Sequence, residues 1–161
     1  MEERKDKTNY YLDIAETVLI RSTCRRREYG AIIVLNDEII ATGYNGAPRG
    51  RKNCLDRGVC LRDELGIPSG ERYELCRSVH AEANAIISAA RRDMIGATLY
   101  LSGRNAKTGE LLADTAPCSM CRRLIINAGI MTTVCRTGAD KYTVINTRDW
   151  VFNDDSLEAA L

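Results

Sequence analysis

The sequence lacks the features that usually place a chain in a membrane, outside the cell or on nucleic acid. Its apolar runs are all too short to span a bilayer, and residues 1–7 carry too much charge for a secretory signal. The formal net charge is +1, which gives no general attraction to nucleic acid or to a membrane surface. We therefore expect a cytoplasmic protein that has neither nucleic acid nor a membrane as a partner.

Histidine is almost absent as well, because His80 is the only one among 161 residues. It stands two positions before Glu82, and a downstream Pro-Cys-Ser-Met-Cys stretch supplies Cys118 and Cys121. A catalytic zinc centre uses three protein ligands of these types and leaves one position open. The pattern His-x-Glu…Pro-Cys-x-x-Cys is the signature of zinc-dependent deaminases. It predicts His80, Cys118 and Cys121 as metal ligands and Glu82 as the catalytic proton carrier.

The spacing within this motif makes a geometric demand. Cys118 and Cys121 share one face of the helix that Pro117 is expected to open. His80 and Glu82 would point apart in the middle of a helix, so they reach one site only if a helix N-terminus points at the metal. Zinc would lower the pKa of its bound water, and Glu82 would pass the proton to the ring and then to the leaving amine.

Length and hydrophobic patterning predict a single domain of the α/β class over residues 1–161. The motif above makes this a zinc-dependent deaminase domain. Helical spacing predicts helices over 8–23, 80–92 and 117–129, and a short one around 156–160. Apolar runs predict strands at 30–35, 38–44, 97–101, 130–136 and 143–145, with Asn36-Asp37 as the turn of a hairpin between the first two. Residues 45–78 are expected to form a long irregular loop, which is uncommon unless function or a bound metal holds it.

Several stretches outside the zinc motif resemble one known family. They are Ser22–Arg27 with Gly30–Val34, Thr42–Gly50, His80–Ile86 and Asp140–Tyr142. From about Tyr11 to Tyr142 the chain is similar to the deoxycytidylate (dCMP) deaminases of the cytidine deaminase superfamily. The Gly-Tyr-Asn-Gly sequence within Thr42–Gly50 separates this family from plain cytidine deaminases. One departure is the segment 103–114, which the family usually lacks and which is expected to border the pocket.

The resemblance implies a three-layer αβα fold with a mixed five-stranded sheet and a homo-oligomer, either a dimer or a hexamer. It implies hydrolysis of dCMP to dUMP, which feeds thymidylate synthesis, with dCTP and dTTP as effectors and Mg²⁺ accompanying such an effector. Asn45 would then contact the sugar hydroxyl, and Tyr142 would stack on the base. From their residue types alone, Asn45 could be a turn residue and Tyr142 a half-buried strand residue.

The basic residues near the first helix suit phosphate recognition, because arginine makes bidentate contacts to phosphate. They are Arg25, Arg26 and Arg27, with Arg49 and Arg51 further along. Of these, Arg26 is the predicted contact to the substrate's 5′-phosphate or to an effector triphosphate. The alternative is that the charged run is a solvated face.

The sequence contains seven cysteines, an odd number that favours metal ligation over disulfides in a cytosolic chain. Cys135 lies in an apolar run and is expected to be buried. The resemblance implies a second zinc near the irregular region. Because no second imidazole exists, we expect thiolates to hold it. Its candidate ligands are Cys24, Cys54, Cys60 and Cys76. The alternative is four unpaired thiols.

Other functions stay open at this point. A deaminase of bases or nucleosides, the deaminase of riboflavin synthesis and a nucleic-acid editing enzyme share the zinc motif, although editing favours a basic surface. A zinc-stabilised nucleic-acid-binding module is the alternative from another class. Glu82 argues against that module, because a structural site generally has four protein ligands and no use for an adjacent carboxylate.

Overall fold

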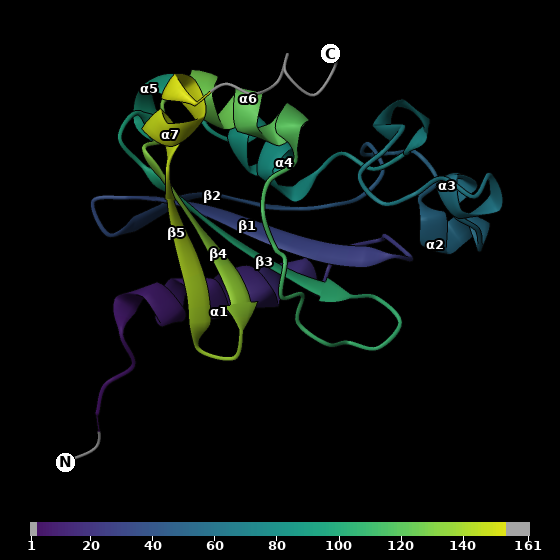
Figure 1. The fold of residues 1–161 in the computed structure, drawn as a ribbon, viewed down its shortest axis with the longest axis horizontal. Coiled ribbons are helices and arrows are strands. Elements are labelled where there is room, and N and C mark those ends of the chain that lie inside the picture. Colours follow the sequence, from purple (N-terminus) through teal and green to yellow (C-terminus); the bar gives the residue numbers. More distant parts are fainter. Residues whose placement is uncertain (1–2, 154–161) are drawn as a thin grey trace.

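Residues 3–153 are described by a computed structural model, and the fold is a sheet between two layers of helices (Figure 1). Its elements are α1 (Lys7–Leu19), β1 (Arg27–Leu35), β2 (Glu38–Tyr44), α2 (Cys54–Arg57), α3 (Leu61–Glu64), the 3₁₀ helix η1 (Tyr73–Leu75), α4 (Ala81–Ile87), α5 (Arg91–Met94), β3 (Thr98–Asn105), α6 (Ser119–Ala128), β4 (Thr132–Gly138), β5 (Lys141–Asn146) and α7 (Thr147–Phe152).

The five strands form one mixed sheet in the order β2-β1-β3-β4-β5. β1 pairs antiparallel with β2 and β3, and β4 pairs antiparallel with β5. β3 and β4 run parallel, with α6 in the crossover between them, as parallel strands require. The α/β class and the mixed five-stranded sheet predicted from the sequence are confirmed.

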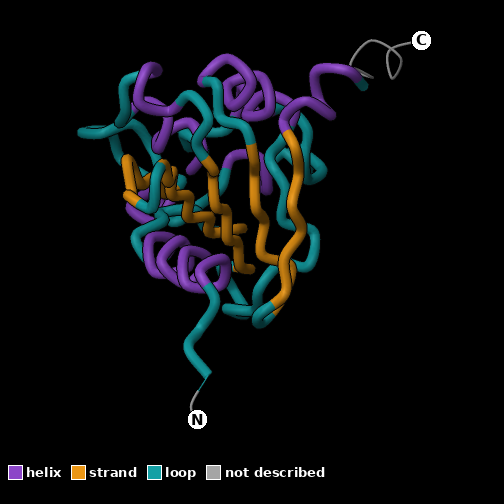
Figure 2. The backbone as a smooth tube through the Cα atoms, turned by 90° about the vertical axis from the view of Figure 1, so that its left-hand side faces the viewer, coloured by secondary structure: helices purple, strands orange, loops and turns teal. Residues whose placement is uncertain are grey.

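α1 covers one face of the sheet. Asp6 caps its first turn by accepting a hydrogen bond of 2.9 Å from the Asn9 N–H. The helix buries Tyr11 and Ala15 against Ile32 of β1, in a core separate from the one on the opposite face. In Figure 2 this helix lies at the lower left, on one side of the strands, and the helices of the opposite layer lie at the top.

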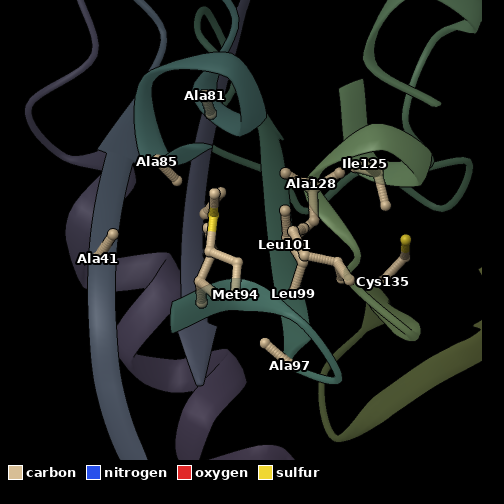
Figure 3. Close-up of a cluster of buried hydrophobic side chains, with 13 residues drawn as sticks. Ala41, Ala81, Ala85, Met94, Ala97, Leu99, Leu101, Ile125, Ala128 and Cys135 are labelled. Carbon is tan, nitrogen blue, oxygen red and sulfur yellow. The ribbon is translucent and has the colours of Figure 1, made fainter. Parts of the chain in front are cut away.

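The opposite face is covered by α4, α5, α6 and α7, and it holds the larger core (Figure 3). β1 contributes Ala31 and Ile33 to this core and directs Ile32 to the α1 side, in accordance with the alternation of a strand. Cys135 of β4 is fully buried there, as expected, and burial raises its pKa to about 12. It therefore acts as a small apolar side chain.

Several predicted boundaries are wrong in informative ways. The helix expected over 80–92 is two helices, α4 and α5, and the loop expected over 45–78 contains α2, α3 and η1. α6 begins at Ser119 with Cys118 as its N-cap, so Pro117 lies before the helix and is not its first residue. α7 was not predicted, and the helix expected around 156–160 lies outside the described residues.

Candidate metal centre and catalytic pocket

The three predicted zinc ligands converge at the N-termini of two neighbouring helices. His80 is the N-cap of α4, Cys118 is the N-cap of α6, and Cys121 lies in the first turn of α6. The Nδ1 atom of His80 is 3.5 Å from the Sγ atoms of both cysteines. Within residues 3–153, this is the one group of three metal-ligating side chains whose donor atoms all lie within 4.8 Å of one another.

The close approach of α4 to β2 sets the position of His80 and Glu82. A side chain on Gly43 of β2 would collide with the backbone of Ala81 and Ala85, so only glycine lets the helix pack this closely. The side chain of Asn84 also donates a hydrogen bond of 2.8 Å to the carbonyl of Tyr44. The start of α4 is therefore held directly over the sheet. His80 and Glu82 both lie at this N-terminus, which is the placement that their two-residue spacing requires.

The electrostatics of the cluster suit a divalent metal. A hydrogen bond from the Cys121 thiol, with further help from His80, lowers the pKa of Cys118 to about 4, and the same interaction raises the pKa of Cys121. The hydrogen bond to Cys118 raises the pKa of His80. Two thiols and an imidazole are the donor set that zinc prefers, and metal binding would release their protons. These residues fit a zinc ion.

Glu82 lies beside the ligands and is 5% exposed. Burial raises the pKa of its carboxyl group, as expected of a side chain that must accept and then return a proton. It lines the same pocket as His80 and Cys118. The structure thus places the proposed proton carrier where a reacting group next to the metal would lie.

Asn45, predicted to contact the sugar, also lines this pocket and is buried. Its side-chain oxygen accepts hydrogen bonds from the Ser22 hydroxyl (2.5 Å) and the Tyr29 N–H (2.8 Å). Its amide nitrogen donates to the Arg27 carbonyl (2.9 Å). Because that nitrogen carries two hydrogens, one N–H is left to offer a ligand.

The four cysteines proposed for a second metal all line this pocket, although they come from separate parts of the chain. Cys24 accepts a backbone hydrogen bond from Arg26 (3.4 Å), and burial raises its pKa. Burial likewise raises the pKa of Cys54. Their sulfur atoms do not form a second group as tight as that of His80, Cys118 and Cys121. The structure gathers these thiols into one region without closing them into a shell.

The structure corrects the prediction for Tyr142. This residue is opposite Arg136 in the β4–β5 ladder, and directly opposed residues share a face of the sheet. Arg136 pairs with Asp13 and Glu16 of α1, so that face is the one away from the metal ligands. Tyr142 does not line the pocket. The sequence pattern placed it on a strand but could not show which face it would occupy.

Two aromatic rings that sequence reasoning missed do line the pocket, Tyr29 and Tyr73. Tyr73 meets the ring of His80 edge to face, with centroids 4.8 Å apart. The guanidinium group of Arg62 lies over the ring of Tyr73, with its central carbon 4.7 Å from the ring centroid. Both Arg62 and Tyr73 come from the region expected to be irregular, where no periodicity signalled their burial.

The segment 103–114 does not close the pocket directly. β3 continues to Asn105, and the chain then turns back, so that the Leu112 N–H bonds to the Gly103 carbonyl at 2.9 Å. Asp114 reaches within 3.6 Å of Arg27, which lines the pocket. None of residues 103–114 lines the pocket itself, so the segment's relation to the substrate stays a prediction.

The His/Cys/Cys donor set and the buried glutamate lie at the N-termini of two helices that pack on a mixed sheet. This donor set with an adjacent glutamate is characteristic of the zinc-dependent deaminase class. Residues 5–137 match the family described as the cytidine and deoxycytidylate deaminase zinc-binding region. The chain belongs to this family.

The chain matches different shares of the length of its relatives. The chain is 38% identical over 132 residues to a deoxycytidylate deaminase of Mycobacterium phage D29, covering 79% of this chain and 91% of the relative. It is 36% identical over 129 residues to a deoxycytidylate deaminase of Schizosaccharomyces pombe, covering 80% of this chain. The match spans only 36% of the length of that yeast relative.

A solved structure shows the same fold. The dCMP deaminase of cyanophage S-TIM5, in complex with dCMP and dUMP, superposes with a TM-score of 0.58. The alignment covers 84% of each chain at 24% sequence identity. This likeness agrees with the helix–sheet–helix layering described above.

Among residues 3–153, no helix combines the length and the apolar character that crossing a bilayer requires.

Proposed function

We propose that this protein catalyses the zinc-dependent hydrolysis of dCMP to dUMP and ammonia, a reaction that supplies thymidylate synthesis. The observation that carries the proposal is the buried carboxyl group of Glu82 beside the His80, Cys118 and Cys121 donors, in a pocket that also contains arginine side chains. Relatives named deoxycytidylate deaminase support the choice of substrate, including the phage protein matched over nearly its whole length.

The proposed chemistry divides between the metal and this chain's own residues. When bound by His80, Cys118 and Cys121, zinc lowers the pKa of water and so supplies a nucleophile at neutral pH. Glu82 would take one proton from water and give it to the ring nitrogen as the new C–O bond forms. It would then take the remaining hydroxyl proton and give it to the amine as the C–N bond breaks and ammonia leaves. Its raised pKa, caused by burial, suits a group that holds the proton between these steps.

Two further residues are proposed to orient the substrate. Asn45 offers its remaining N–H to the sugar hydroxyl, while its other polar atoms are held by Ser22, Tyr29 and Arg27. Arg26 lines the pocket, and its Nη1 atom is buried without a hydrogen-bond partner among the described residues. We assign it to the 5′-phosphate of the substrate.

Ammonia release from dCMP, dCTP, cytidine and cytosine, measured side by side, tests this function. The proposal expects dCMP to be the preferred substrate. A chain that deaminates cytidine and leaves dCMP unchanged would overturn it. Loss of activity on removing zinc with a chelator, and recovery on returning it, is the accompanying check on the metal.

We also propose a second zinc held by Cys24, Cys54, Cys60 and Cys76. All four line one pocket, and a closed metal site would anchor a region whose helices are only three or four residues long. Metal analysis by mass spectrometry should give close to two zinc ions per chain. Replacing Cys54 and Cys60 together by serine should remove one of them, whereas Cys135→Ala, in the core, should keep both. About one zinc in the unaltered chain would contradict the second site.

The assembly and its regulation remain part of the proposal. We expect a dimer or a hexamer, dCTP and dTTP as effectors with Mg²⁺ accompanying the nucleotide, and a cytoplasmic location. Sedimentation with and without dCTP and Mg²⁺ tests the oligomeric state, and turnover measured with dCTP or dTTP tests the effectors. A monomer whose turnover does not respond to either nucleotide would reject both expectations.

A further inference from the structure

Arg62 of α3 is a buried charge with few partners. The residue is 6% exposed and lines the catalytic pocket. Its guanidinium donates one hydrogen bond of 3.1 Å to the Pro68 carbonyl and lies over the ring of Tyr73. Its Nε atom is buried and has no hydrogen-bond partner within residues 3–153.

The other arginines that line the pocket have acidic neighbours. Arg26 lies 3.0 Å from Asp63, and Arg27 lies 3.6 Å from Asp114. Arg62 forms no ion pair with any carboxylate of the described chain. Burying an unpaired cation is costly, and proteins normally pair such a group or leave it for an anionic ligand.

Arg26 and Arg62 reach this pocket from different segments, one before β1 and one in α3. Each carries a buried guanidinium nitrogen without a partner, Nη1 of Arg26 and Nε of Arg62. Tyr73 contacts both Arg62 and His80, which links the arginine to a metal ligand through one shared ring. This layout suits a ligand that has a reacting ring at one end and an anionic group at the other.

We propose that Arg62 is a specificity-determining residue that binds the 5′-phosphate together with Arg26 and makes the pocket select a nucleoside monophosphate over a nucleoside. The inference rests on the proposed function and extends it to a residue supplied by the segment between β2 and α4. Arginine suits this role because its planar fork matches phosphate oxygens.

Equilibrium binding to the Glu82→Gln chain tests the proposal without depending on turnover. Adding Arg62→Gln should raise the Kd for dCMP roughly 10- to 100-fold, as expected for a lost charge-assisted hydrogen bond. The Kd for deoxycytidine should change less than about twofold, because the nucleoside lacks the phosphate. Arg62→Lys, which keeps the charge, should retain part of the preference. Arg57→Gln, on the exposed end of α2, is the matched control and should alter neither Kd.

Two results would overturn the role of Arg62. Equal weakening for dCMP and deoxycytidine would show that it supports the pocket generally. A fall in bound zinc in the Arg62→Gln chain would show that the arginine neutralises thiolates. If the unaltered chain binds dCMP through Arg62 yet releases no ammonia from it, the proposed function fails while this inference stands.

Discussion

The rings of Tyr73 and His80 meet edge to face, with their planes inclined at 84° and their centroids 4.8 Å apart. Through this contact a short 3₁₀ helix of the 45–78 region supports the only imidazole of the chain. Burial raises the pKa of Tyr73, so its hydroxyl stays protonated at neutral pH. The ring therefore contributes by packing and not by proton transfer.

Removing this ring should weaken catalysis without removing the catalytic groups. Tyr73→Ala eliminates the contacts with both His80 and Arg62, which together are worth about 1–2 kcal/mol. We expect kcat/KM for dCMP to fall roughly tenfold, because a free-energy difference of about 1.4 kcal/mol corresponds to a factor of ten. Tyr73→Phe keeps the ring and should stay close to the unaltered enzyme. If the phenylalanine variant is as impaired as the alanine variant, the hydroxyl has a role that packing does not explain.

Glu82→Gln should separate proton transfer from metal binding. The amide fills nearly the same volume but cannot carry a proton, so kcat should fall by at least about 10²- to 10⁴-fold. Zinc content should be unchanged, because Glu82 is not one of the three ligands. Glu74→Gln, an exposed carboxyl group paired with Arg72, provides the control. Normal turnover by Glu82→Gln would refute the assigned role.

Gly43→Ala, a substitution on β2, should displace the metal ligand at the start of α4. The new Cβ would collide with the backbone of Ala81 and Ala85, so the N-terminus of α4 must move away from the sheet. We expect lower thermal stability and weaker zinc binding, because His80 moves with that terminus. The matched control is Gly138→Ala, where a Cβ would meet only the Lys141 side chain, at 3.6 Å. Equal zinc affinity in both variants would show that α4 tolerates the displacement.

Prediction from the sequence was most accurate where a local motif itself specifies how its residues are arranged in space. The hairpin at Asn36-Asp37 was predicted from turn residues, and both adopt positive φ angles between β1 and β2. The convergence of His80 with Cys118 followed from the motif's chemistry, which has meaning only if the groups meet. In both cases a local signal specifies the geometry.

It failed where burial depends on partners distant in sequence. Arg62 looks like any surface arginine of a polar loop, and only the packing of α3 against Tyr73 makes it part of the pocket. Tyr142 was assigned to the substrate by resemblance, but the β4–β5 register places it with Arg136 on the α1 face. A register changes the face of every residue on a strand, and no local pattern in this short exposed strand reveals it.

Arg136 provides a prediction about stability that is independent of the catalytic pocket. Its guanidinium is 3% exposed and joins β4 to α1 through Asp13 (2.8 Å) and Glu16 (2.6 Å). It also donates to the carbonyl and the side chain of Asn9, both at 3.3 Å. Arg136→Met should therefore loosen α1 from the sheet. We expect a loss of about 1–3 kcal/mol near neutral pH, because the two carboxylates stay partly hydrated.

The pH dependence of this loss gives the sharper test. Burial tends to raise the pKa of Asp13, but hydrogen bonds from Lys5 and Arg136 outweigh it and hold the pKa below its usual range. A carboxyl group of this kind stabilises the fold above its unfolded pKa of about 3.9, and the contribution disappears as the pH falls through the folded value. The difference in unfolding free energy between the unaltered chain and Arg136→Met should thus shrink below about pH 4. Lys141→Met, an exposed change on β5, should show no such trend; a gap for Arg136→Met that stays constant with pH would mean that the arginine acts by packing alone.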